Sequence, residues 1–73
     1  GPYRLYFFSH EPNEPAHVHV DRDAASAKVW LSPVSLARNA GFKPQELRAI
    51  IALVSSNRIE LLEAWHDFFG RSG

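Results

Sequence analysis

The chain has 73 residues, with eight basic and eight acidic side chains, four histidines and no cysteine. A chain of this length has a small core, and without disulfides the burial of apolar side chains has to stabilise it. The balanced charge gives no general attraction to nucleic acid, and no apolar run reaches the roughly 20 residues that span a bilayer. We therefore expect a single cytoplasmic domain over residues 1–73 that does not enter a membrane.

Three segments predict an antiparallel sheet. Residues 3–9 are rich in aromatic side chains, which favour strands. Residues 16–22 and 27–31 alternate apolar with polar side chains, and the short polar stretch between them suits a hairpin connection. This alternation places Val18 and Val20 on the face that packs against the core. We expect three antiparallel strands, or four if one has been lost at the N-terminus.

Two helices are predicted to follow the strands. Ser32 and Pro33 fit the N-cap and the first position of a short helix over residues 33–39. Apolar residues then recur with helical spacing over residues 44–69, with a weak middle around Asn57 that could hold a break. Strands first and helices second predict an α+β domain, in which a small antiparallel sheet packs against one short and one long helix.

The segment Glu14-Pro15-Ala16-His17-Val18-His19-Val20-Asp21 carries the most distinctive spacing of polar side chains. On a strand, His17, His19 and Asp21 share one face, opposite the valines. The α-carbons of the two histidines would lie about 6.6 Å apart, near enough to share one metal ion or to flank one phosphate. We expect this face to be open to solvent, where the histidines, with no chemical role, would hydrogen-bond to the acidic loop or to a partner.

Two chemical interpretations of the histidine pair are also open. In the first, His17 and His19 bind a divalent metal ion such as zinc. The site would be completed by one further side chain from the set Asp21, Glu14 and His66. The alternative for His66 is a cation or donor near the end of the long helix.

In the second, His17 and His19 act as general acid and general base on an RNA phosphodiester. Lys28 or Arg4, from neighbouring strands, would stabilise the charged transition state. This arrangement would make the protein a small metal-independent ribonuclease.

Aromatic side chains on the histidine side of the sheet indicate a binding surface. Tyr6, Phe8 and Trp30 fall on that side by strand alternation. An exposed aromatic patch usually marks a protein interface, here with a partner or a second copy of the chain. The alternatives are that a loop or helix covers these rings, or that RNA bases stack on them.

Nearly the whole chain resembles the small bacterial proteins of the domain-of-unknown-function family forty-one-sixty. The segments that carry the resemblance are Phe7-Phe8-Ser9, residues 14–20, residues 27–31, Gly41-Phe42, Glu46-Leu47 and residues 61–70. The proline-to-HVHV segment is the most specific of these. The sequence departs from the family pattern at Ala16, where a second proline is common, and at Lys43, where a helix-capping serine is common.

Members of that family resemble toxin-antitoxin components, because they are often encoded beside another small protein. The resemblance therefore implies a member of a two-protein module that acts mainly through protein–protein binding. The alternative is a small ribonuclease or metal-dependent hydrolase that uses the His17/His19 pair. The expected partner is the small protein from the same locus, and a homodimer or RNA binding is also open.

Overall fold

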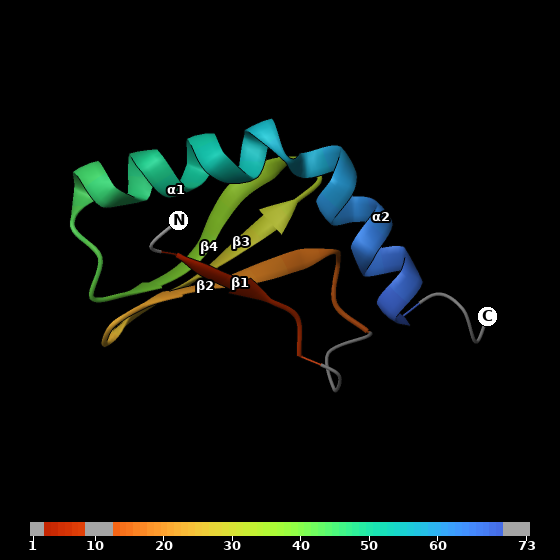
Figure 1. Ribbon diagram of the computed structural model, residues 1–73, viewed down its shortest axis with the longest axis horizontal. Coiled ribbons are helices and arrows are strands. Elements are labelled where there is room, and N and C mark those ends of the chain that lie inside the picture. Colours follow the sequence, from red (N-terminus) through yellow and green to blue (C-terminus); the bar gives the residue numbers. More distant parts are fainter. Residues whose placement is uncertain (1–2, 9–12, 70–73) are drawn as a thin grey trace.

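Four strands precede two helices in the computed structural model, which describes residues 3–8 and 13–69 (Figure 1). The strands pair antiparallel in the order β1-β2-β3-β4. The elements are β1 (Arg4–Tyr6), β2 (His17–Arg22), β3 (Ala25–Leu31), β4 (Val34–Ala40), α1 (Pro44–Ser56) and α2 (Arg58–Phe69). The predicted α+β class, with an antiparallel sheet followed by helices, is confirmed.

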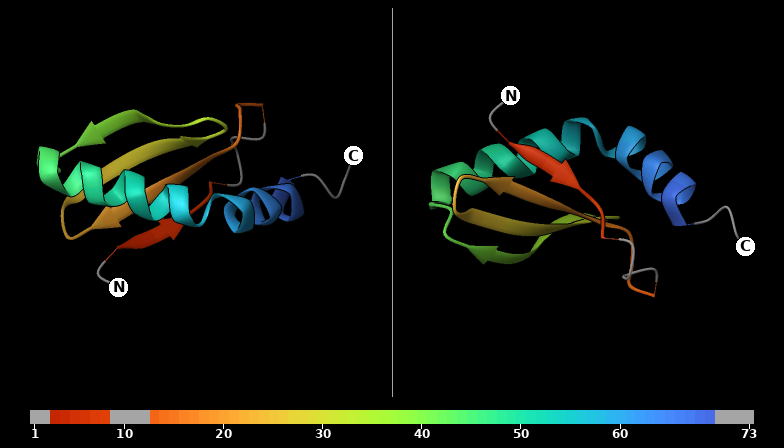
Figure 2. Two further views of the ribbon diagram at one scale, coloured as in Figure 1. Left: turned by 90° about the horizontal axis from the view of Figure 1, so that it is seen from above. Right: turned by 60° about the horizontal axis from the view of Figure 1, so that its bottom comes forward.

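Helix α1 crosses the valine face of the sheet, as expected, and α2 lies beside the end of the strands (Figures 1 and 2). Because strand residues alternate between faces, one side chain in two from β2 and β3 reaches this core. Ile50 and Val54 of α1 are fully buried against it. The buried core comprises Val18, Val20, Ala27, Val29, Leu31, Phe42, Ile50 and Val54.

The prediction of a short helix over residues 33–39 is wrong, because this segment forms strand β4. Leu31 and Val34 are paired in the β3–β4 ladder, so Ser32 and Pro33 are the two residues that connect the strands, with a cis peptide bond between them. A serine–proline pair suits a helix start and also a turn, and here the backbone hydrogen bonds to β3 decide the outcome. The fourth strand therefore follows β3 in the chain.

The predicted long helix over residues 44–69 consists of two helices, and the break falls at the weak middle. The backbone N–H of Asn57 donates to the carbonyl of Leu53 at 3.2 Å, and the Asn57 side-chain amide donates to the same carbonyl at 2.8 Å. Together these bonds satisfy a carbonyl at the end of α1. The chain then turns into α2 (Figure 1), which brings Trp65 to a buried position with 6% exposure.

The first helix begins at Pro44, as predicted, with Lys43 at the N-cap position. The Glu46 carboxylate accepts a hydrogen bond from the Lys43 backbone N–H at 3.0 Å, so a side chain of the first turn satisfies the N–H of the N-cap residue. Glu46 also forms an ion pair with Arg22 at 3.3 Å, so this carboxylate links the start of α1 to the end of β2.

The first strand is shorter than the predicted span of residues 3–9, because β1 ends at Tyr6. Ser9, the last residue of that span, lies outside the described residues. Within the described parts of the chain, neither helix has the length and apolar character needed to cross a membrane.

Candidate functional site

The two histidines of β2 are buried, which overturns the expectation of a solvent-open histidine face. His17 has 0% and His19 has 2% of its surface exposed. Both side chains do lie on the face opposite the core valines. Aromatic rings from β1, β3 and α2 cover that face around the two histidines. The alternation of side chains along β2 cannot predict this burial, because it says only which side chains share a face.

His17 is held by one backbone hydrogen bond and by two tryptophans. Its Nδ1 atom lies 2.8 Å from the carbonyl oxygen of Pro15. Because a carbonyl only accepts, this contact assigns the proton to Nδ1. The His17 ring centroid lies 5.6 Å from that of Trp30 and 4.9 Å from that of Trp65. His17 therefore connects the sheet to α2.

His19 is enclosed by rings from the first strand and the segment that follows it. It pairs with Tyr6 in the β1–β2 ladder, and the two rings stack with centroids 5.3 Å apart and an interplanar angle of 19°. The Phe8 ring lies 4.5 Å from the His19 ring. This side chain is consequently part of a packed layer of rings.

The Tyr6 hydroxyl donates to both carboxylate oxygens of Asp21, at 3.2 and 3.1 Å. Burial, followed by this hydrogen bond and the negative charge of Asp21, raises the pKa of Tyr6 above its usual value. Arg4 lies over the Tyr6 ring, 5.0 Å from its centroid, and its charge opposes that rise in pKa. The carboxylate of Asp21 is thus bound to Tyr6 in the same layer.

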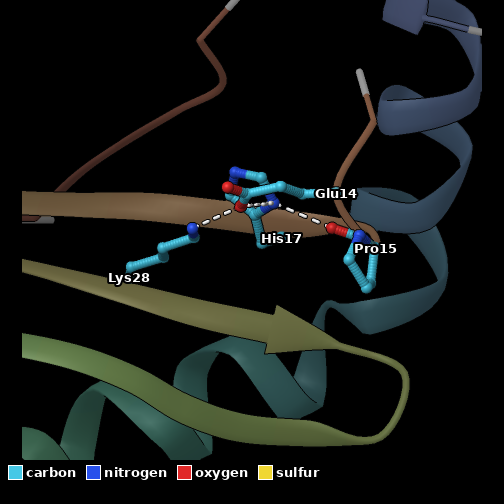
Figure 3. Close-up of polar contacts among 4 residues, drawn as sticks. All are labelled: Glu14, Pro15, His17 and Lys28. Atoms are coloured by element: carbon cyan, nitrogen blue, oxygen red, sulfur yellow. Dashed lines mark hydrogen bonds and ion pairs between the residues drawn. The ribbon is translucent and has the colours of Figure 1, made fainter. Parts of the chain in front are cut away.

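Glu14, His17 and Lys28 lie close together at the edge of this layer of rings (Figure 3). The Lys28 ammonium forms an ion pair with the Glu14 carboxylate. The same carboxylate oxygen lies 3.8 Å from Nδ1 of His17. Lys28 also lies over the Trp30 ring, 4.8 Å from its centroid. Three of the predicted site residues therefore form one polar contact chain beside a half-buried tryptophan.

The rings around the histidines form a continuous cluster, which we call the aromatic cluster. Each member contacts at least one other, with centroid distances between 4.1 and 5.8 Å. Phe8 and Phe68 are its most exposed members, at 39% and 51%. The cluster consists of Tyr6, Phe7, Phe8, His17, His19, Trp30, Trp65, Phe68 and Phe69.

The three predicted interface residues, Tyr6, Phe8 and Trp30, all belong to the aromatic cluster. The sequence does not predict the α2 members of the cluster, Trp65, Phe68 and Phe69, because their helical spacing is also typical of ordinary core packing. A usable signal was the density of aromatic residues near the end of the chain, where three of the five residues 65–69 are aromatic.

The five candidate metal ligands do not gather in one place. His66 is exposed on α2, while its neighbour Trp65 points into the aromatic cluster. Asp21 is hydrogen-bonded to Tyr6, and Glu14 contacts Lys28. Across residues 3–8 and 13–69, no group of three or more histidine, aspartate or glutamate side chains is arranged to hold a metal ion.

The amino-acid sequence of this chain matches one known family over most of its length. A family model described as a domain of unknown function, DUF4160, matches residues 3–66. This match covers most of the chain, so the protein belongs to that family, as the resemblance implied. A search of curated proteins and a search of solved structures each found no significant match.

Proposed function

We propose that this chain is one member of a two-protein module and acts by binding a partner protein through the exposed side of the aromatic cluster. The observation that carries this proposal is the exposure of Phe8 and Phe68, at 39% and 51%, on rings that are otherwise packed together. Exposed aromatic surface is costly in water, and aromatic side chains are enriched at the centres of protein interfaces.

The buried members of the aromatic cluster support such a surface from below. His17 contacts Trp30 and Trp65, so it fixes a sheet ring and a helix ring relative to each other. Side chains that are already held in place lose little conformational entropy when a partner binds. In this proposal the histidines act by positioning the aromatic rings, and the partner contacts Phe8, Trp30 and Phe68.

The experiment is a calorimetric titration of the chain with the small protein encoded beside it. Phe68→Ala should raise Kd at least tenfold, because the proposal makes Phe68 a central anchor of the interface, and loss of such an anchor costs about 2 kcal/mol or more. The matched control is Ile59→Ala, since Ile59 is also on α2, is apolar and is 56% exposed. It lies outside the aromatic cluster, and its replacement should change Kd less than twofold.

Circular dichroism of both variants checks that each one is folded. The proposed use of the aromatic cluster is wrong if the neighbouring protein does not bind the wild-type chain. It is also wrong if Phe68→Ala and Ile59→Ala bind that protein as tightly as wild type does.

A second candidate function is acid–base cleavage of RNA or another hydrolysis that uses His17 and His19. The observation that favours it is the contact chain from Lys28 through Glu14 to His17, since a carboxylate beside an imidazole can orient a catalytic base (Figure 3). Its test is RNA cleavage by wild type and by Lys28→Gln, with and without zinc. Because the Lys28 side chain is only 15% exposed and contacts Glu14 and Trp30, circular dichroism checks that Lys28→Gln is folded. Cleavage that Lys28→Gln abolishes would favour the enzyme, and equal background in both proteins would reject it.

A further inference from the structure

Two positive side chains lie directly opposite each other on the sheet. Lys28 of β3 pairs with Arg38 of β4, so both occupy the same face as Trp30. Like charges at directly opposed positions of a sheet repel each other. Glu14 neutralises Lys28, and none of the ion pairs within the described residues includes Arg38. This part of the sheet consequently carries one uncompensated positive charge.

Arg38 is also accessible along the strand. It is exposed, and β4 is an edge strand in the sheet order. Its neighbours on the same face of β4 are the small residues Ser35, which pairs with Trp30, and Ala40, which pairs with Ser26. In the view from above, β4 lies to one side of α1 (Figure 2). An extended segment of another protein can therefore lie along β4 and reach the Arg38 guanidinium.

We propose that Lys28, Trp30, Ser35 and Arg38 form a subsite for an acidic segment of the partner protein. This inference rests on the proposed function, since it names the chemistry of the partner that binds beside the aromatic cluster. A guanidinium binds a carboxylate with two parallel hydrogen bonds, and the negative charge would compensate Arg38, the positive side chain that Glu14 does not neutralise.

The observations favour an acidic protein segment over a nucleic acid. The chain has a formal net charge of zero, whereas proteins that follow a phosphate backbone depend on many positive side chains. The Trp30 ring already has the Lys28 ammonium 4.8 Å from its centroid, and a stacking base would have to displace it. A carboxylate beside Arg38 requires no such displacement.

The test compares two exposed arginines in calorimetric titrations with the small protein encoded beside this chain. Arg38→Glu and Arg48→Glu change the net charge by the same amount, and Arg48 is on α1, away from the sheet face. Arg38→Glu should raise Kd at least tenfold, and Arg48→Glu less than twofold. Arg38→Gln should also reduce the dependence of Kd on salt concentration. Circular dichroism verifies the fold of each variant.

The outcomes separate this inference from the proposed function. If Arg38→Glu binds as tightly as wild type while Phe68→Ala does not, the proposal of an acidic partner segment is wrong and the aromatic interface is retained. Equal weakening by Arg38→Glu and Arg48→Glu would show a general charge effect and would also overturn the subsite. If wild type does not bind the neighbouring protein, the proposed function fails and the subsite fails with it.

Competition distinguishes the two kinds of anion. Poly-L-glutamate should displace the neighbouring protein from the wild-type chain, and poly(U) RNA at the same concentration of charge should not. If poly(U) binds and displaces the partner where poly-L-glutamate has no effect, the surface recognises nucleic acid and the inference is wrong.

Discussion

The ring of His17 lies 4.9 Å from the ring of Trp65, and this contact joins the second strand to the last helix. The two residues are 48 positions apart in the sequence, at positions 17 and 65. His17 is completely buried and its Nδ1 is bonded to the Pro15 carbonyl. The histidine strand is therefore a structural link between the two parts of the aromatic cluster.

Replacement of His17 should destabilise the fold. His17→Ala leaves a cavity between Trp30 and Trp65 and deprives the Pro15 carbonyl of its donor. We expect the free energy of unfolding to fall by about 2–4 kcal/mol, measured by urea denaturation. His66→Ala is the control, since His66 is exposed, and its effect should stay within about 0.5 kcal/mol. Equal stability of His17→Ala and wild type would contradict the structural role of His17.

Stability at alkaline pH should depend on the hydrogen bond between Tyr6 and Asp21. The pKa of Tyr6 is raised by burial and then by Asp21, so above about pH 10 the folded state keeps a proton that the unfolded state has lost. This contribution to stability is complete below about pH 10 and disappears as the pH rises through the folded pKa. Urea denaturation of wild type should therefore show a loss of stability over that range.

In Tyr6→Phe, which has no hydroxyl to ionise, this part of the loss should be absent. Tyr3→Phe serves as the control, because Tyr3 makes its ring contacts with Phe42 and Arg22 on the other side of the sheet. If Tyr6→Phe and wild type lose the same stability above about pH 10, the pKa of Tyr6 is not raised in the folded state.

Gly41 should not tolerate a side chain. Its φ angle is +104°, and a Cβ atom built there would lie 3.3 Å from Cα and Cβ of Ala25. Because L-residues are strained in this region, Gly41→Ala should lower the free energy of unfolding by about 1–2 kcal/mol. Asp23 also has a positive φ, +54°, and here the reverse substitution is expected to be tolerated. Asp23→Gly relieves strain and should not reduce stability. Thermal or urea denaturation in which Gly41→Ala is the more stable variant would contradict this turn geometry.

The sequence predicted those elements whose side-chain pattern is strong. Val18 and Val20 alternate with the histidines, which gave the second strand and its core face correctly. The prediction for residues 33–39 failed because β4 has no buried residue and therefore no clear alternation. Ser32 and Pro33 fit both a helix start and a turn. Local pattern decides an element only where packing and backbone preference agree.

The candidate site was only partly predictable for a different reason. The two-residue period correctly put His17, Asp21 and Trp30 on one face. It could not show that Trp65 from α2 would bury that face, since this depends on the turn at Asn57 and on a contact distant in sequence. Accessibility is decided by tertiary packing, which the period of a single strand does not contain.

The most direct test of the central claim is an NMR titration of the isotope-labelled chain with its proposed partner, a small protein from the same locus. The account predicts saturable shifts of the Trp30 indole N–H and of the backbone amides of Phe8 and Phe68, with Leu53 and Ile59 unchanged. Shifts confined to α1, or no shifts at concentrations sufficient for a micromolar complex, would contradict a partner interface on the aromatic cluster.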